Sequence, residues 1–193
     1  MVLLGMTKSE ERLRKAYPSE EKLEQLLAQM AEGCFEALEE LYLHTKTAVY
    51  GFALSILKHP QNAEDVMQET YLRLYQAAAS YRPQGKPMAW ILTVVRNLSL
   101  KKIQEQPRDV LPIDEDWQIA DSADFTSESA ERTLLQGALE HLSEEERQIV
   151  LLHSLTGLKH REIAELLHLP LSTVLSKHHR ALSKLKKIMK EEK

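Results

Sequence analysis

The side chains with the clearest binding chemistry lie near the carboxyl end, on a helix predicted from about residue 172 to 189. Five of them recur at the i, i+3, i+4, i+7, i+8 spacing of one helical face: Ser172, Leu175, Ser176, His179 and Arg180. Thr173 lies beside them, and three lysines flank the face: Lys177, Lys184 and Lys187. Hydroxyl and guanidinium groups on such a face can bond base edges in a DNA major groove, while lysines neutralise phosphates. The alternative is a terminal amphipathic helix whose lysines only complement its dipole.

A second candidate surface belongs to a helix predicted over residues 62–80. One side of this helix gathers residues suited to a core: Ala63, Val66, Met67, Thr70, Tyr71 and Leu74. The opposite side carries Asp65, Gln68, Glu69, Leu72 and Gln76, with Leu72 at its centre. An apolar anchor with a carboxylate rim can dock a basic partner. The alternative is a solvated face with one exposed leucine, which is common on protein surfaces.

The residue spacing shows no motif typical of a catalytic or metal-binding site. No nucleophile, base and orienting group fall into a recognisable pattern, and no glycine-rich phosphate-binding loop is present, so we expect neither an enzyme nor a cofactor. Six of the eight histidines follow residue 140, but none forms an H-E-x-x-H pair, and adjacent His178 and His179 point to different faces. We therefore expect no metal site. The single cysteine, Cys34, excludes an internal disulfide and is expected to be a small core residue.

Helical periodicity runs through most of the chain, and no sustained strand pattern interrupts it, so the predicted fold class is all-α. Helices are expected at about residues 20–32, 34–57, 62–80 and 87–105. In the carboxyl-terminal part, Ser143 and Glu146 have capping-box spacing at the start of a helix to Leu155. A short helix at 160–167, a tight turn at 168–170 and the long basic helix follow, with Ser172 predicted as its N-cap. This order resembles a helix-turn-helix.

The inner side of that long helix is predicted to pack against the rest of its domain. Its stripe comprises Val174, His178, Ala181, Leu182 and Leu185. This stripe and the outer face described above divide the helix between core and solvent.

Charge divides the chain into domains. Residues 107–128 hold one basic and seven acidic groups in an aperiodic, proline-containing stretch, while the whole chain has a net charge of −4. We predict an amino-terminal extension at 1–22, a helical domain at 23–106, a flexible acidic linker at 107–128 and a helix-turn-helix domain at 129–193. Fully extended, such a linker reaches at most about 70 Å, but as a free coil it spans only about 26 Å.

The chain as a whole has the composition of a soluble protein, with 43% hydrophobic and 28% charged residues. No apolar run is long enough to span a bilayer, and the first residues lack the features of a signal peptide, so a cytoplasmic location without membrane insertion is expected. The negative net charge gives little general attraction to phosphate, so a DNA-binding role would suit a subunit delivered by a larger assembly.

Three segments, taken in order, resemble bacterial RNA polymerase sigma factors of the extracytoplasmic-function (ECF) type. They are AEDVMQETYLRLY, MAWILTVVRNLSL, and the stretch from ALEHLSEEERQIV through LKHREIAELLHLPLSTVLSKHHRALSKLKK. The resemblance covers about residues 30–105 and 134–188. It implies a transcription-initiation subunit that binds core RNA polymerase, recognises promoter DNA and assists strand opening.

The resemblance also implies roles for particular residues. Asp65, Gln68, Glu69 and Leu72 would bind the coiled coil of the largest polymerase subunit, and the carboxyl-terminal domain would lie near the flap. The minus-ten element would be contacted by Arg82, Lys86, Arg96, Asn97 and Lys101, with an unpaired base held by the loop 81–87. Tyr81 and Trp90 are stacking candidates there, although Trp90 also suits a core position. The predicted outer face of the last helix would read the minus-thirty-five element. An inhibitory anti-sigma factor is a further expected partner.

Some positions depart from the family pattern. Leu175 stands where a basic residue is common, His178 where an apolar one is common, and His168 where the turn often has glycine. Two other functions therefore stay open: a stand-alone helix-turn-helix regulator, and a polymerase-docking adaptor that does not read promoter sequence.

Overall fold

The structure is a computed structural model that describes residues 18–105 and 141–191, with side chains to Ile188 in the second range. Every regular element in these ranges is helical, which confirms the predicted all-α class. The first range contains α2 (Glu20–Ala31), α3 (Phe35–Leu57), α4 (Pro60–Ala77), the 3-10 turn η1 (Ala78–Ser80) and α5 (Pro87–Glu105). The second contains α7 (Glu144–Thr156), α8 (His160–Leu167) and α9 (Leu171–Glu191). None of the described helices is long and apolar enough to cross a membrane.

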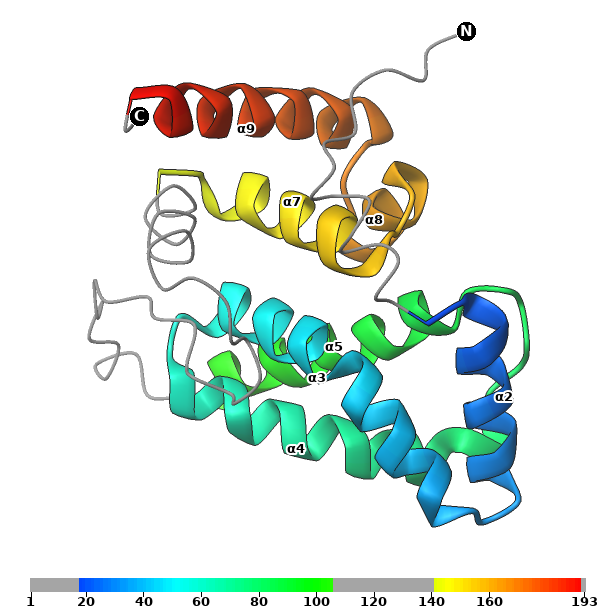
Figure 1. Ribbon diagram of the computed structural model, residues 1–193. Coiled ribbons are helices and arrows are strands. Elements are labelled where there is room, and N and C mark those ends of the chain that lie inside the picture. The colour runs from blue at the N-terminus through cyan, green and yellow to red at the C-terminus, as the bar shows by residue number, and fades with distance from the viewer. Residues whose placement is uncertain (1–17, 106–140, 192–193) are drawn as a thin grey trace, which may run out of the picture.

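The amino-terminal body is built on the mutual packing of α3, α4 and α5, with α2 lying across α3 and η1 (Figure 1). Its core holds fully buried large side chains from all four helices, among them Leu26, Phe52, Leu74, Met88 and Ile91. The side of α4 predicted to face the core does so, since Ala63, Val66, Thr70, Tyr71 and Leu74 are buried and Met67 is partly buried. The opposite side of α4 is thereby presented to solvent.

Polar contacts fix the packing of α4 on α3. The Thr45 hydroxyl donates to the Leu41 carbonyl over 2.7 Å, so its oxygen is left to accept from the Tyr71 hydroxyl, 2.8 Å away. Both side chains are buried, and a buried hydroxyl left without a partner costs about 1–3 kcal/mol. This pair therefore orients the middle of α4.

The carboxyl-terminal body begins with α7, whose predicted capping box is present. Ser143 accepts from the Glu146 backbone N–H, and the Glu146 carboxylate accepts from the Ser143 backbone N–H over 3.0 Å. The bounds of α8 match the prediction. It ends at Leu167 and is capped by His168, which has the left-handed conformation (φ +56°) expected of the turn.

Two expectations about α9 are wrong. Ser172 is not the N-cap, because the helix starts at Leu171 and the Pro170 carbonyl accepts from Thr173 and Val174. Leu182 is not an inner residue, since 36% of it is exposed. At 100° per residue it lies about 80° from Val174 around the helix, whereas buried Leu185 lies within about 20°.

The two bodies pack directly against each other. α7 lies along α3, where Gly51 faces Leu155: a Cβ on that glycine would lie 3.7 Å from Leu155 Cδ1, an ordinary van der Waals contact. α8 contacts α5, and Lys58 Nζ forms an ion pair with Glu144 Oε2 over 2.9 Å. Buried apolar side chains form one continuous core through both bodies. The described residues thus form a single closed arrangement (Figure 1); the predicted linker, 107–128, lies outside them.

Candidate nucleic-acid and protein interfaces

The outer face of α4 presents Leu72 to solvent. This side chain is 58% exposed, and Asp65 and Gln68 on the same face are exposed as well. Glu69 is partly buried. The four residues predicted as a docking face therefore share one accessible side of a helix whose other side is fixed in the core.

The carboxylates on this face already have cationic partners. Asp65 Oδ2 pairs with Lys102 Nζ of α5 over 2.6 Å, and Glu69 Oε1 accepts from Arg73 Nε over 2.8 Å. The hydrogen bond from Lys102 holds the pKa of the Asp65 carboxyl below its usual value. A partner with basic groups would have to exchange these contacts. Because three of the four groups are about half exposed to solvent, the exchange costs little, about 0–1 kcal/mol for a pair.

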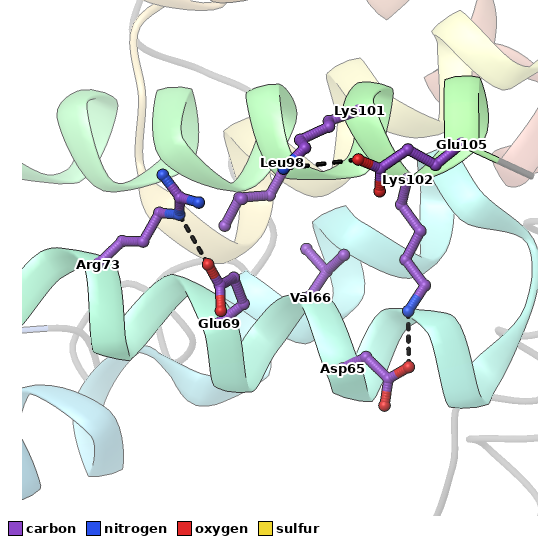
Figure 2. A pocket seen from close by; sticks show the side chains of 8 residues that line it. All are labelled: Asp65, Val66, Glu69, Arg73, Leu98, Lys101, Lys102 and Glu105. Atoms are coloured by element: carbon purple, nitrogen blue, oxygen red, sulfur yellow. Dashed lines mark hydrogen bonds and ion pairs between the residues drawn. The ribbon is translucent and has the colours of Figure 1, made fainter.

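An open groove of about 270 Å³ runs between α4 and α5 beside these pairs (Figure 2). Its lining consists of Asp65, Val66, Glu69, Arg73, Leu98, Lys101, Lys102 and Glu105. The groove brings two predicted docking residues, Asp65 and Glu69, next to one predicted DNA-binding residue, Lys101. Lys101 pairs with Glu105 over 3.5 Å. No pattern in the sequence indicated that Lys102 pairs with Asp65, since the two residues lie 37 positions apart, and none indicated a role for Arg73.

The loop before α5 is held by a carboxylate from α2. Glu24 Oε1 accepts from the Gly85 backbone N–H over 2.8 Å and from the Tyr81 hydroxyl over 3.3 Å. Burial, followed by the Glu24 charge, raises the pKa of Tyr81 to about 12. Trp90 is partly buried and its ring lies 4.9 Å from that of Tyr81 at 49°. The aromatic pair and Glu24 thus preorganise this loop.

The predicted minus-ten residues line the loop and α5. Arg82 and Lys86 in the loop are exposed, as are Asn97 and Lys101, which lie one helical turn apart. Arg96 is partly buried. Lys86 forms an ion pair with the carboxyl-terminal body, because its Nζ lies 3.6 Å from Glu165 Oε2 of α8.

The predicted DNA-reading face of α9 is solvent-accessible. Exposed residues on it are Ser172, Leu175, Ser176, His179 and Arg180, and Thr173 is partly buried. Arg180 Nε donates to the Ser176 carbonyl over 3.3 Å, which directs the guanidinium back along the helix. The accessible groups combine one guanidinium, hydroxyls, an imidazole and an apolar side chain.

Two of the flanking lysines contact α7. Lys177 Nζ pairs with Glu145 Oε2, and Lys184 Nζ with Glu146 Oε2, each over 2.7 Å. The Glu146 side chain is 5% exposed. Burial opposes its ionisation, but the contacts with Lys184 and Ser143 outweigh burial and lower the pKa of Glu146. Lys184 therefore holds α9 against α7, a role that the sequence analysis did not assign to it.

Residues 41–108 match the protein family Sigma-70 region 2, and residues 132–185 match Sigma-70, region 4. The ECF RNA polymerase sigma factor SigK of Mycobacterium ulcerans (strain Agy99) is 31% identical over 171 residues, covering 85% of this chain and 91% of SigK. SigK of Mycobacterium sp. (strain KMS) is 28% identical over 177 residues, with 85% and 89% covered. This chain belongs to the ECF RNA polymerase sigma factors.

Two solved structures share the fold of this sigma factor. RpoE of Bartonella quintana, solved with the anti-sigma factor NepR, superposes with a TM-score of 0.60 at 23% identity over 80% of this chain and 98% of RpoE. CnrH, solved with the cytosolic domain of CnrY, gives a TM-score of 0.58 at 20% identity, covering 89% of this chain and 99% of CnrH. The region 2 match contains α4, the loop and α5, and the region 4 match contains α7, α8 and most of α9. The protein is a transcription-initiation sigma factor.

Proposed function

We propose that this sigma factor binds core RNA polymerase through the outer face of α4. Support comes from Leu72, an exposed apolar side chain centred among Asp65, Gln68 and Glu69. Such an anchor gains affinity when it is buried, and the surrounding polar groups set orientation and partner choice. The carboxylates suit a basic surface such as that expected of the largest-subunit coiled coil.

Recognition of the minus-ten element is proposed for the loop and α5. The Glu24 contacts hold Tyr81 and Gly85, so the loop offers a preformed surface with aromatic rings at its base. Single-stranded DNA binds to surfaces that combine stacking groups with cations. Arg82 and Lys86 supply cations in the loop, and Arg96, Asn97 and Lys101 supply further contacts along α5.

Recognition of the minus-thirty-five element is proposed for the exposed face of α9. Ser176 and Arg180 carry groups that bond base edges, and Leu175 offers an apolar contact suited to a thymine methyl. Because Lys177 and Lys184 pair with glutamates of α7, their contribution to phosphate binding is smaller than their number suggests.

The closed arrangement, in which α7 packs on α3, is proposed to open when the complex forms. A compact chain of this length has a radius of gyration of about 16 Å, whereas two DNA elements two helical turns apart are separated by about 70 Å. One closed molecule cannot reach both. The acidic linker, about 70 Å long at full extension, would then be stretched between the two bodies.

The domain limits and the other predicted partners form part of the same proposal. Region 2 would end before the 107–128 linker and region 4 would follow it; α2 begins at Glu20, inside the stretch predicted as an extension. We propose a cytoplasmic, non-enzymatic subunit without a cofactor of its own. An anti-sigma factor is proposed as inhibitor, because RpoE and CnrH were both solved with protein partners, of which NepR is an anti-sigma factor.

Photo-crosslinking in a promoter complex tests these assignments. A crosslinker at Lys101 should label the minus-ten region, and one at Arg180 should label the minus-thirty-five region, only when core polymerase is present. A crosslinker at exposed Glu39 on α3 provides the control. Labelling of DNA by the free chain with the same pattern would support a stand-alone regulator instead, and absence of labelling in an active complex would refute both contact assignments.

A fluorescence measurement tests the opening step. In a Cys34→Ser background, dyes on Glu39→Cys and Lys186→Cys would report the separation of α3 and α9, since both positions are exposed. Energy transfer should fall below its value in the free chain when core polymerase and promoter DNA are added. Unchanged transfer in a transcribing complex would contradict the proposal.

A further inference from the structure

Three histidines from three different helices meet in the carboxyl-terminal body. His153 lies near the end of α7, His160 is the first residue of α8, and His178 lies on the inner side of α9. The three ring centroids are 4.7, 4.8 and 4.7 Å apart, and one ring nitrogen from each residue lies within 4.8 Å of the other two. His160 Nε2 is 3.1 Å from His178 Nδ1. The function proposed above uses none of these side chains.

The hydrogen bond from His153 decides which of its ring nitrogens keeps a lone pair. His153 Nδ1 is 2.9 Å from the Leu158 carbonyl oxygen, which can only accept, so Nδ1 carries the proton and Nε2 keeps its lone pair. Fixing one imidazole nitrogen by a backbone carbonyl while the other binds metal is the usual arrangement of metal-ligating histidines. In His178 the nitrogen that faces His160 is Nδ1, while the other ring nitrogen, Nε2, is buried without a hydrogen-bond partner among the described residues.

We propose that His153, His160 and His178 form a binding site for a divalent transition-metal ion of the zinc class. Ligand nitrogens around tetrahedral Zn²⁺ lie about 3.3 Å from one another, given Zn–N bonds of about 2.05 Å. The contact between His160 and His178 already has nearly this separation. The remaining nitrogens, all within 4.8 Å, can close on an ion by side-chain rotation.

The ligand set determines which ions fit. Neutral imidazoles favour Zn²⁺, Co²⁺, Ni²⁺ and Cu²⁺, whereas Mg²⁺ and Ca²⁺ require oxygen ligands, and no carboxylate belongs to the cluster. Burial, followed by the neighbouring imidazoles, lowers the pKa of His178 to about 4, and burial lowers the pKa of His160. An imidazole binds metal in its neutral form. Three protein ligands leave a fourth position for water or an external ligand.

A bound ion would connect α7, α8 and α9 at one point. His178 lies two residues from Ser176 and Arg180, so the ion would fix the segment of α9 that carries the proposed DNA-reading face. Metal that binds only the folded chain also raises its stability by mass action. The site is expected to act as a clamp within the helix-turn-helix, and it stands independently of whether that face reads DNA.

Residue spacing within single helices, from which no metal site was expected, does not contain this cluster. The ligands are separated by seven and eighteen residues and come together only through the turn at residues 157–159 and the packing of α9 on α7. The side-by-side His178 and His179 do point to different sides of α9, one inward and one to solvent.

Metal titration of the untagged full-length chain tests the proposal. After removal of metal with a chelator, the chain should bind one Zn²⁺ by calorimetry, raise its thermal midpoint on adding Zn²⁺, and give the visible absorption of tetrahedral Co²⁺ when Co²⁺ is used. His178→Leu places an apolar side chain at a partly buried position and removes a metal ligand. Loss of a group that only hydrogen-bonds a ligand typically weakens metal binding ~10- to 100-fold, so loss of the ligand itself should weaken Zn²⁺ binding by more than that. His160→Gln should do the same.

The matched control is His179→Leu, which removes the adjacent exposed histidine and should leave Zn²⁺ affinity and the Co²⁺ spectrum unchanged. Circular dichroism of the metal-free variants checks that they fold, and the Co²⁺ spectrum of the unsubstituted chain gives a measurement that does not depend on any variant. The proposal is overturned if that chain shows no stoichiometric binding and no tetrahedral Co²⁺ spectrum. Equal loss of affinity in the His179→Leu and His178→Leu variants would also overturn it.

Discussion

Replacing Leu72 is predicted to weaken the complex with core polymerase without unfolding the protein. Complete burial of a leucine side chain is worth about 1.5–3 kcal/mol. Since 58% of Leu72 is exposed in the free chain, docking can still bury that fraction. The available gain is about 1–2 kcal/mol, which corresponds to a 5- to 30-fold change in dissociation constant for Leu72→Ala.

Leu72→Asp should weaken binding further, because it also forces a carboxylate into the centre of the interface. Binding of labelled core polymerase by fluorescence anisotropy gives the dissociation constants. Leu175→Ala is the matched control, since Leu175 is 47% exposed on α9 and lies outside the docking face. Thermal midpoints should stay close to that of the unsubstituted chain, as exposed substitutions usually change stability by less than about 0.5 kcal/mol. Equal affinities for the Leu72→Asp variant and the unsubstituted chain would refute the docking face.

Three further predictions concern other parts of the molecule. Lys184→Met leaves the buried carboxylate of Glu146 without its cation and should lower unfolding free energy by about 1–2 kcal/mol in urea titrations, less than for a fully buried pair because Lys184 is half exposed. Folding lowers the pKa of Glu146, so the ionised Glu146 stabilises the folded protein at pH values above its unfolded pKa. This stabilisation is lost as the pH falls through the folded pKa, so the difference in unfolding free energy between Lys184→Met and the unsubstituted chain should shrink in strong acid. Glu24→Gln should bring the pKa of Tyr81 down from about 12, measured by ¹³C NMR of the tyrosine ring, and slow open-complex formation; an unchanged pKa would show that burial alone raises it. Arg180→Ala should weaken minus-thirty-five binding in the polymerase complex by about 1–3 kcal/mol; an equal loss on scrambled DNA would make it a phosphate contact.

Local signals in the sequence predicted the helices well. The capping box of Ser143 and Glu146, and the limits of α8, depend on residues close together in the chain, so the sequence contains the information that determines them. The division of α4 into a buried and an exposed side follows from helical geometry alone. The exposure of Leu72 was predictable for the same reason.

Competition between local signals explains the errors. Serine is in general a better N-cap than proline. After the left-handed His168, however, the Leu169 N–H donates to the Ala164 carbonyl and the chain turns. The Pro170 carbonyl then accepts the first backbone hydrogen bonds of α9. Leu182 was grouped with the inner stripe because it is apolar, although its angular position lies at the edge of that stripe.

Contacts between distant residues were not predictable from one sequence. The pairs Asp65–Lys102 and Lys184–Glu146 join residues 37 and 38 apart, and each changes the interpretation of a predicted binding residue. The packing of α7 on α3 also gave no sequence signal, because Gly51 and Leu155 are ordinary residues of their own helices. Such features depend on tertiary packing, which residue spacing along one helix does not contain.

Run-off transcription with purified core polymerase tests the central claim most directly. Templates drawn from the chain's own genome should yield discrete transcripts only when this protein is added, and the Leu72→Asp variant should yield none while retaining its helical content. The contrary result would be a chain that binds specific duplex DNA by itself, has no measurable affinity for core polymerase and supports no initiation.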